Sequence, residues 1–184
     1  MNIIETGFPG LVIIEPRVFE DDRGYFFESF QEVRYKQAGI EQSFVQDNES
    51  KSGKNVVRGL HYQLNEAAQA KLVRVIQGSV FDVAVDLRTG SPTFGKWFGV
   101  ELNESNKKQL FIPRGFAHGF SVLSETAIFT YKCDNVYNKA AERSINPFDS
   151  VLNIDWKVAN ENAVVSEKDG IAPLFKEAEM DFIF

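Results

Sequence analysis

Short apolar segments separated by turn residues follow one another along most of this 184-residue chain, and this pattern most limits its fold. The expected strands cover residues 11–16, 24–30, 43–50, 55–63, 71–78, 79–88, 96–103, 109–113, 118–124 and 127–133. Many short strands with little helix between them are typical of antiparallel all-β proteins. A double-stranded β-helix jelly roll, with a few short peripheral helices, closes that many strands with few exposed edges.

Local signals refine this architecture. The Gly78-Ser79 junction between two strong strand patterns predicts a β-hairpin. A helix is expected over residues 31–38, with Gly39 placed to end it, and a second short helical piece is expected near the C-terminus. No linker, repeat or low-complexity segment interrupts the chain, so we expect one domain over residues 1–184.

Charge and cysteine content limit the partners. The net charge of −6 argues against nonspecific binding to nucleic acid, because there is no excess of cations to displace counterions from phosphates. The single cysteine, Cys133, cannot form an internal disulfide, which suits a reducing compartment. The opening MNIIETGFPG lacks the features of a signal peptide, and no apolar run approaches a membrane span. We therefore expect a cytoplasmic protein with neither nucleic acid nor membrane as a partner.

Strand alternation raises the question of what faces the interior. Asp82 lies on the less apolar face of the segment 79–88, and Lys71 and Tyr131 lie on expected strands of their own. If all three point into one barrel mouth, they bring an acid, a base and a phenol to one cavity. For strands taken alone, the ordinary position of Lys71 and Asp82 is the solvent-facing surface.

The segment VVRGLHYQ, residues 56–63, carries one of only two histidines. Strict alternation puts Arg58 and His61 on opposite faces, and a bulge at Gly59 is what would bring them together. The alternative is a histidine hydrogen-bonded in the core. The second histidine, His118 in IPRGFAHGF, is suited either to orienting a ligand or to capping a turn.

Metal and nucleotide motifs are missing from the sequence. The residue two after His61 is Gln63, so the histidines lack the paired spacing of a transition-metal site. The chain also lacks GxGxxG, P-loop and GxSxG motifs. We expect an enzyme of this kind to work by acid–base chemistry, with no metal and no cofactor.

Seven stretches resemble the dTDP-4-dehydrorhamnose 3,5-epimerase family, a branch of the cupin jelly rolls. They are FEDDRGYFFESF, FVQDNES, VVRGLHYQ, KLVRVIQGSVFDVAVDLRTGSPTFGKW, QLFIPRGFAHGF, TYKCDNVY and SEKDG, in this order over nearly the whole chain. The resemblance implies a dTDP-4-keto-6-deoxyhexose substrate that is inverted at carbons 3 and 5. It also implies a homodimer in which N-terminal strands contribute to the partner's sheet and site, and apolar surface on the first strands agrees with this.

The resemblance implies a catalytic role for four residues. His61 is the base, Asp169 of SEKDG orients its imidazole, Tyr131 is the acid on the opposite face, and Lys71 steadies the enolate oxygen. Such chemistry needs a base, an opposed acid and a positive group near the developing oxyanion. From shared strand faces we further expect Asp82 to fix Lys71.

The resemblance also implies a set of substrate-binding residues: Arg23, Glu28, Gln46, Asp47, Asn48, Arg58, His118, Tyr137, Glu142 and Lys168. The two arginines suit phosphate because a guanidinium fork makes bidentate contacts. Plain surface charge is the alternative for Glu142 and Lys168. Glu49 departs from the pattern, because some relatives have a histidine there.

Three other functions stay open. A carbon-3-only epimerase would use the same base and acid. A ketoisomerase on a related dTDP-deoxysugar is opposed by Gln63, where a His-x-His arrangement is expected. A noncatalytic sugar-nucleotide binding module is opposed by the set of His61, Tyr131 and Asp169, since binding alone needs no opposed acid and base.

Overall fold

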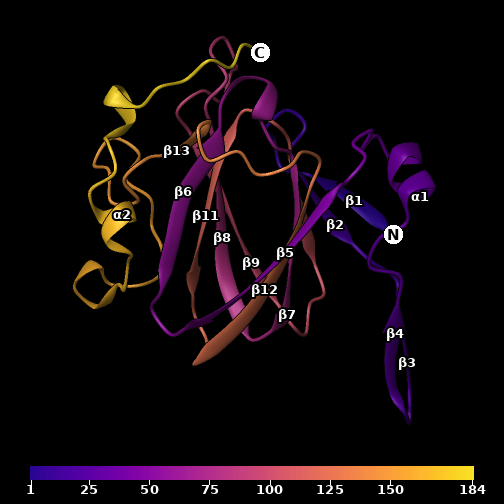
Figure 1. Ribbon diagram of the computed structural model, residues 1–184. Helices are drawn as coiled ribbons and strands as arrows, with labels where there is room; N and C mark the ends of the chain where they lie inside the picture. The colour runs from indigo at the N-terminus through magenta and orange to yellow at the C-terminus, as the bar shows by residue number, and fades with distance from the viewer.

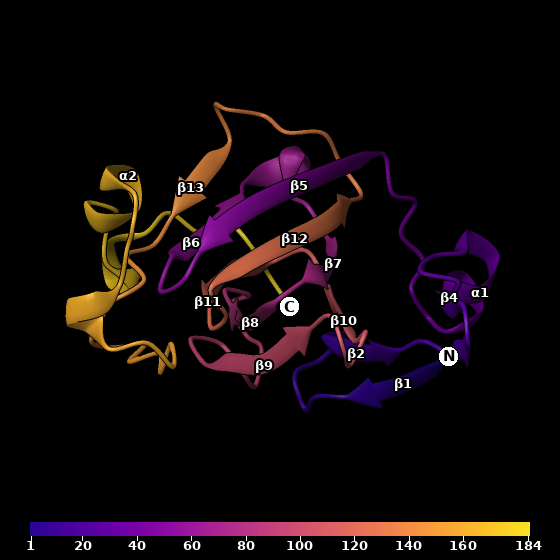
Figure 2. The same cartoon turned by 90° about the horizontal axis from the view of Figure 1, so that it is seen from below.

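Two antiparallel sheets face each other in a computed structural model that describes residues 1–184, and they form the expected all-β, cupin-like jelly roll (Figure 1). The six-stranded sheet contains, in order, β1 (Asn2–Glu5), β2 (Val12–Glu15), β10 (Gln109–Ile112), β7 (Lys71–Gln77), β12 (Thr126–Cys133) and β5 (Gln46–Gly53). The five-stranded sheet contains β13 (Glu142–Ser144), β6 (Val57–Gln63), β11 (Phe116–Val122), β8 (Ser79–Asp86) and β9 (Trp97–Asn103). Seen from below, the strands of the two sheets lie around a common interior (Figure 2).

A separate hairpin of β3 (Val18–Asp21) and β4 (Gly24–Phe27) projects away from the two sheets (Figure 1). Aromatic side chains on this hairpin are exposed, including Phe19, Tyr25 and Phe26. The hairpin therefore carries apolar surface that this chain does not cover.

The prediction of a β-hairpin at Gly78 is wrong, because β7 and β8 belong to different sheets. Gly78 has φ +78°, and a Cβ built on it would lie 2.1 Å from the carbonyl oxygen of Thr126. The backbone there is pressed against β12 as the chain crosses from one sheet to the other. A short Gly-Ser junction indicates a sharp turn, but it does not say in which sheet the next strand continues.

The helices are short and peripheral, as expected. Helix α1 (Glu32–Gln37) begins after Gln31, whose side chain accepts a hydrogen bond from the Arg34 amide, and Gly39 follows it with φ +88°. The C-terminal region holds α2 (Glu167–Gly170) and two 3₁₀ turns, η2 (Asn160–Asn162) and η3 (Phe175–Glu177), and a further turn, η1 (Asn65–Ala67), follows β6. No helix has the length and apolar character needed to cross a membrane.

Both faces of β8 are buried, which is why alternation alone did not place Asp82. Phe81 and Val83 pack outside the five-stranded sheet, beneath the C-terminal segment that runs along it (Figure 1). Val80 and Ala84 face the interior between the sheets. Asp82 shares that inner face and is fully buried, so the solvent-facing alternative is wrong for it.

The interior is filled unevenly. Apolar side chains occupy most of it, among them Val73, Leu102, Leu110, Phe120 and Phe129. Outside the six-stranded sheet, α1 and the residues around it cover one end through a third apolar cluster. Polar side chains gather at the other end of the interior, between β5, β6, β7, β11 and β12, and there the barrel is hollow.

Candidate active site

Two adjoining hollows open between the sheets, and both are lined by His61, Lys71 and Tyr131. The inner hollow is also lined by Glu49, Ser50, Arg58, His118, Gly119, Phe120 and Phe129. The outer hollow, here called the mouth, is also lined by Gln46, Asn48, Tyr62, Gln63, Gln69, Phe116, Tyr137 and Glu142. The residues singled out for catalysis thus meet in one cavity.

A local shift in β6 brings Arg58 and His61 into the same cavity. Against β11, Arg58 is paired with Phe120 and His61 with His118, so β6 uses one residue more than β11 between the two pairs. Gly59 has φ +120°, and a Cβ built on it would lie 2.6 Å from the Cα of Gly119. Of the alternatives left open by the sequence, the bulge at Gly59 is the one present, and it depends on a backbone approach that only glycine permits.

His61 is hydrogen-bonded to Asp169, with 2.7 Å between Nε2 and Oδ1. The carboxylate is fixed in α2, where the Asp169 amide donates to the Ser166 hydroxyl and Oδ2 accepts from the Gly59 amide. Burial by itself would raise the pKa of Asp169, but hydrogen bonding to His61 and attraction to it hold that pKa below its usual value. A charged carboxylate on Nε2 leaves Nδ1 as the ring nitrogen without a protein partner.

Tyr131 and Lys71 lie on the opposite wall, on the neighbouring strands β12 and β7. The Lys71 ammonium lies 5.7 Å from the centre of the Tyr131 ring and makes no hydrogen bond within the protein. Burial raises the pKa of the Tyr131 phenol and lowers the pKa of the Lys71 ammonium. Tyr131 therefore carries its proton at neutral pH, and Lys71 has free N–H donors to offer a ligand.

The second histidine belongs to a fully buried pair. His118 lies within β11 rather than at a turn, which excludes turn capping, and its Nε2 is 2.9 and 3.1 Å from the two oxygens of Asp82. Asp82 was expected to fix Lys71, but it is hydrogen-bonded to His118 instead. Asp82 influences Lys71 only through the charge of its carboxylate. Burial raises the pKa of Asp82 and lowers the pKa of His118.

Polar side chains at the mouth form a connected group. Glu142 accepts hydrogen bonds from Lys168 at 2.6 Å and from the Tyr137 hydroxyl at 3.0 Å. The Tyr137 amide donates to Gln46, which in turn donates to Asn48 at 3.2 Å. Glu142 and Lys168 are therefore part of the mouth, not isolated surface charges.

Gln63 and Arg58 are held by the protein in different ways. The Gln63 amide donates to the carbonyl of Ala67 and accepts from the amide of Asn138, so it fixes the loop that carries Tyr137. Arg58 donates from Nε to the Ser52 hydroxyl at 2.9 Å, which leaves its terminal nitrogens free.

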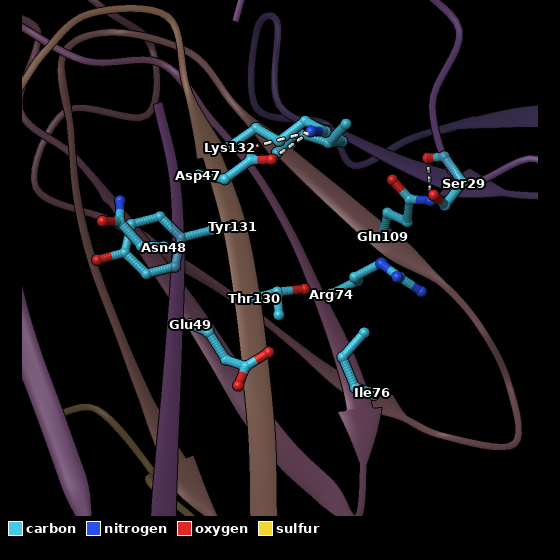
Figure 3. Close-up of a pocket in the computed structure, with 11 residues that line it drawn as sticks. Ser29, Asp47, Asn48, Glu49, Arg74, Ile76, Gln109, Thr130, Tyr131 and Lys132 are labelled. Carbon is cyan, nitrogen blue, oxygen red and sulfur yellow. Dashed lines mark hydrogen bonds and ion pairs between the residues drawn. The ribbon is translucent and has the colours of Figure 1, made fainter. Parts of the chain in front are cut away.

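Three expected site residues lie outside the cavity. Asp47 points to the outer face of the six-stranded sheet, where it pairs with Lys132 at 2.9 Å in a groove with Arg74 and Thr130 (Figure 3). Arg23 sits on the projecting hairpin with a side chain 90% exposed. Glu28 follows the hairpin and pairs with Arg34. Within one chain the structure does not bring these three residues to His61.

Ser50 and Ser52 line or support the cavity and were missed by the sequence analysis. Their signal is the period-two row of polar residues on β5, in which Gln46 and Asn48 precede them on the same face. No cluster of three or more His, Cys, Asp or Glu side chains is arranged as a metal site.

The fold and this cavity define a class of protein, a cupin-type isomerase whose cavity holds a histidine–carboxylate pair opposite a tyrosine. A family model described as dTDP-4-dehydrorhamnose 3,5-epimerase matches residues 5–177. The chain belongs to the dTDP-4-dehydrorhamnose 3,5-epimerase family.

Individual relatives agree with this assignment. The dTDP-4-dehydrorhamnose 3,5-epimerase of Shigella flexneri is 54% identical over 180 residues, which cover 97% of this chain and 98% of that protein. A 3,5-epimerase of Legionella pneumophila, solved in complex with dTDP-4-keto-L-rhamnose, is 50% identical with a TM-score of 0.95, covering 100% of this chain and 98% of the other. A 3'-monoepimerase of Streptomyces bikiniensis, solved in complex with dTDP-quinovose, is 32% identical with a TM-score of 0.84, covering 91% and 84%.

Proposed function

We propose that this protein converts dTDP-4-dehydro-6-deoxy-D-glucose to dTDP-4-dehydro-L-rhamnose by inverting carbons 3 and 5, a step of dTDP-L-rhamnose biosynthesis. The observation that carries the proposal is the opposed placement of His61 and Tyr131 on the two walls of one cavity. Inversion next to a ketone needs a base on one face of the sugar and an acid on the other. Full-length similarity to 3,5-epimerases supports this substrate.

The proposed mechanism uses each wall once at each carbon. His61 takes the proton from carbon 3 through Nδ1. The C–H electron pair forms a double bond between carbons 3 and 4, and the π pair of the C=O bond moves onto the carbon 4 oxygen to give an enolate. Lys71 donates hydrogen bonds to that oxygen. Tyr131 then gives its proton to the carbon from the opposite face. His61 releases to solvent the proton that it took, and Tyr131 regains a proton from solvent. Repetition at carbon 5 completes a reaction with no net gain or loss of atoms.

The binding residues divide between the two hollows. Arg58 and His118 face the inner hollow, where the sugar would lie. Gln46, Asn48, Tyr137, Glu142 and Lys168 surround the mouth, and we propose that the diphosphate and nucleoside are held there. No metal ion or cofactor takes part in these steps.

We further propose a cytoplasmic homodimer made of single-domain subunits, in which Arg23, Glu28 and Asp47 act across the subunit boundary. The exposed aromatic residues of the β3–β4 hairpin support a dimer, since a hairpin surrounded by solvent rarely exposes so many aromatic side chains. Mixing inactive His61→Ala and Arg23→Ala subunits tests it. If Arg23 acts in the partner's site, about a quarter of native activity returns, because each mixed dimer contains one site with both residues intact. Arg23 acting within its own chain predicts no recovery.

The carbon-3-only epimerase remains the second candidate, because the Streptomyces bikiniensis relative carries the same fold with that activity in its name. The ketoisomerase is opposed by Gln63, whose amide is engaged with Ala67 and Asn138. The binding module has no use for an opposed acid and base.

Proton NMR of dTDP-4-dehydro-6-deoxy-D-glucose incubated with the protein in D₂O separates these functions. Deuterium at carbons 3 and 5, absent with His61→Ala, is the result expected for a double epimerase. Label at carbon 3 alone would replace the proposal with the single epimerase. No exchange at either carbon would leave only a binding function.

A further inference from the structure

The Ser50 hydroxyl is buried in the wall of the inner hollow and has no hydrogen-bond partner in the protein. Buried hydroxyl groups are normally paired, because an unpaired one loses its bond to water and gains nothing in return. An unpaired group in the wall of a ligand cavity points to a partner on the ligand.

The neighbours of Ser50 on β5 show that the missing partner is specific to this position. Asn48 accepts a hydrogen bond from Gln46, and Ser52 accepts one from Arg58. Ser50 lies between them on the same inward face. The row therefore holds one polar side chain that the protein itself leaves free.

The position of Ser50 along the strands tells which part of the substrate it would meet. Asn48 is paired with Tyr131, and Ser50 with Phe129, which is one step further from the mouth. Phe129 stacks on His118 with 6.0 Å between the ring centres. Ser50 therefore belongs to the level of His118, beyond the part of the cavity where Gln46 and Tyr137 stand.

Ser50 itself carries no charge, so its natural partner is a small, uncharged oxygen. The inner hollow around it is lined by Phe120 and Phe129 and by the charged side chains of Glu49, Arg58 and Lys71. A nucleoside or diphosphate is too large to share this space with the sugar, and the mouth offers Lys168 and Tyr137 for it. A ring hydroxyl of the hexose fits the donor and acceptor character of a serine.

We propose that Ser50 is a further substrate-binding and specificity-determining residue, whose hydroxyl hydrogen-bonds a ring hydroxyl of the hexose. This inference rests on the proposed function, since it takes the 4-keto-6-deoxyhexose as the sugar in the inner hollow. The partner is the hydroxyl on carbon 2 or the one on carbon 3.

The test compares Ser50→Ala with the native enzyme on three substrates: the parent sugar nucleotide and its 2-deoxy and 3-deoxy analogues, each followed by deuterium uptake at carbon 5. Ser50→Ala is expected to lower kcat/KM on the parent about tenfold. On the analogue that lacks the bonded hydroxyl, native and variant enzymes should be equal, and this identifies carbon 2 or carbon 3. An equal loss on all three substrates, or no loss on the parent, would overturn the proposal.

Ser52→Ala is the matched control, because it removes a serine from the same face of β5 but acts through Arg58. Its loss should be the same on all three substrates. Thermal unfolding adds a second readout: Ser50→Ala should be at least as stable as the native protein, since it deletes an unpaired hydroxyl. A less stable Ser50→Ala protein would mean that the serine is structural. Native enzyme that leaves the parent unchanged would instead refute the proposed function.

Discussion

His61 and His118 are cross-strand partners on β6 and β11, and each has its Nε2 on a carboxylate of its own, Asp169 for His61 and Asp82 for His118. The two carboxylates are tuned in opposite directions, because the pKa of Asp169 is lowered and that of Asp82 is raised. A charged Asp169 stabilises the imidazolium that forms when His61 takes a proton. Burial lowers the pKa of His118, which keeps its ring neutral and suited to hydrogen bonding. When the pKa values of two similar groups are shifted in opposite directions, the two groups are suited to different acid–base roles.

Replacing Asp169 with Asn should slow the reaction without emptying the site. The amide cannot stabilise the imidazolium and favours the wrong tautomer of His61, so kcat should fall about 10²- to 10⁴-fold. Steady-state kinetics measures the fall, and calorimetry with dTDP checks that binding is kept. Asp155→Asn, which changes an exposed aspartate paired with Lys157, is the control and should keep full activity. Native kcat in Asp169→Asn would remove the dyad from the mechanism.

Replacing Tyr131 with Phe should separate proton removal from inversion. The ring and its packing remain, and His61 can still take a proton and return deuterium from D₂O to the same face. Exchange at carbon 3 should therefore persist while epimerised product falls by about 10²-fold or more. Proton NMR reports both quantities in one experiment. Inversion at the native rate would assign the acid to another residue.

The alkaline limb of the pH–rate profile should belong to Lys71. Burial lowers the pKa of Lys71 from its usual value of about 10.4 and raises that of Tyr131 from about 10, so Lys71 loses its proton first as the pH rises. Activity should thus decline at a pH below the ordinary lysine pKa. Lys71→Arg, which keeps its charge at every accessible pH, should move that limb upward even if its maximum rate is lower. A limb unchanged in Lys71→Arg would assign it elsewhere.

The sequence predicted α1 and most of the strands, but not β1, β3 or β13, and it named Gly59 as the place where a bulge would let His61 meet Arg58. These features depend on local patterns of apolar residues, turns and glycine. The sequence left open which way Asp82 faces, because both sides of β8 are covered and a polar residue on either face is buried. It misjudged Gly78 because crossing between sheets and turning back within one use the same local signal. Ser50 escaped notice because its importance comes from what it fails to contact, which only the assembled interior reveals.

Gly59→Ala should disrupt the site through the backbone. Its φ is +120°, and the added Cβ would lie 2.6 Å from the Cα of Gly119. Because that neighbour is a backbone atom, it cannot easily move away. Gly24→Ala is a matched control, with φ +124° and no atom within 4 Å of the added Cβ. Gly24→Ala should cost about 1–3 kcal/mol of unfolding free energy from backbone strain alone, and Gly59→Ala clearly more. Equal costs in urea unfolding would mean that β6 and β11 relax apart.

Asp86 should stabilise the fold without taking part in the chemistry. Its fully buried carboxylate receives hydrogen bonds from Arg88 at 2.8 and 2.9 Å, from Ser91 at 2.6 Å and from Thr93 at 2.7 Å. Asp86→Ala leaves the Arg88 guanidinium without its partner, at a cost of about 3–5 kcal/mol in unfolding free energy. Urea unfolding measures this, and kcat of the folded fraction should stay native.

The pH dependence of that stability follows from the pKa of Asp86. Burial would raise it, but the hydrogen bonds from Arg88, Ser91 and Thr93 hold it below its usual value. A carboxyl whose folded pKa lies below the unfolded value of about 3.9 contributes its stability above that pH, and the contribution fades as the pH falls toward the folded pKa. The native protein should therefore lose stability below about pH 4 more steeply than Asp86→Asn, which has no proton to bind at this position. Parallel acid-unfolding curves for the two proteins would show that the Asp86 network does not set the acid limit of the fold.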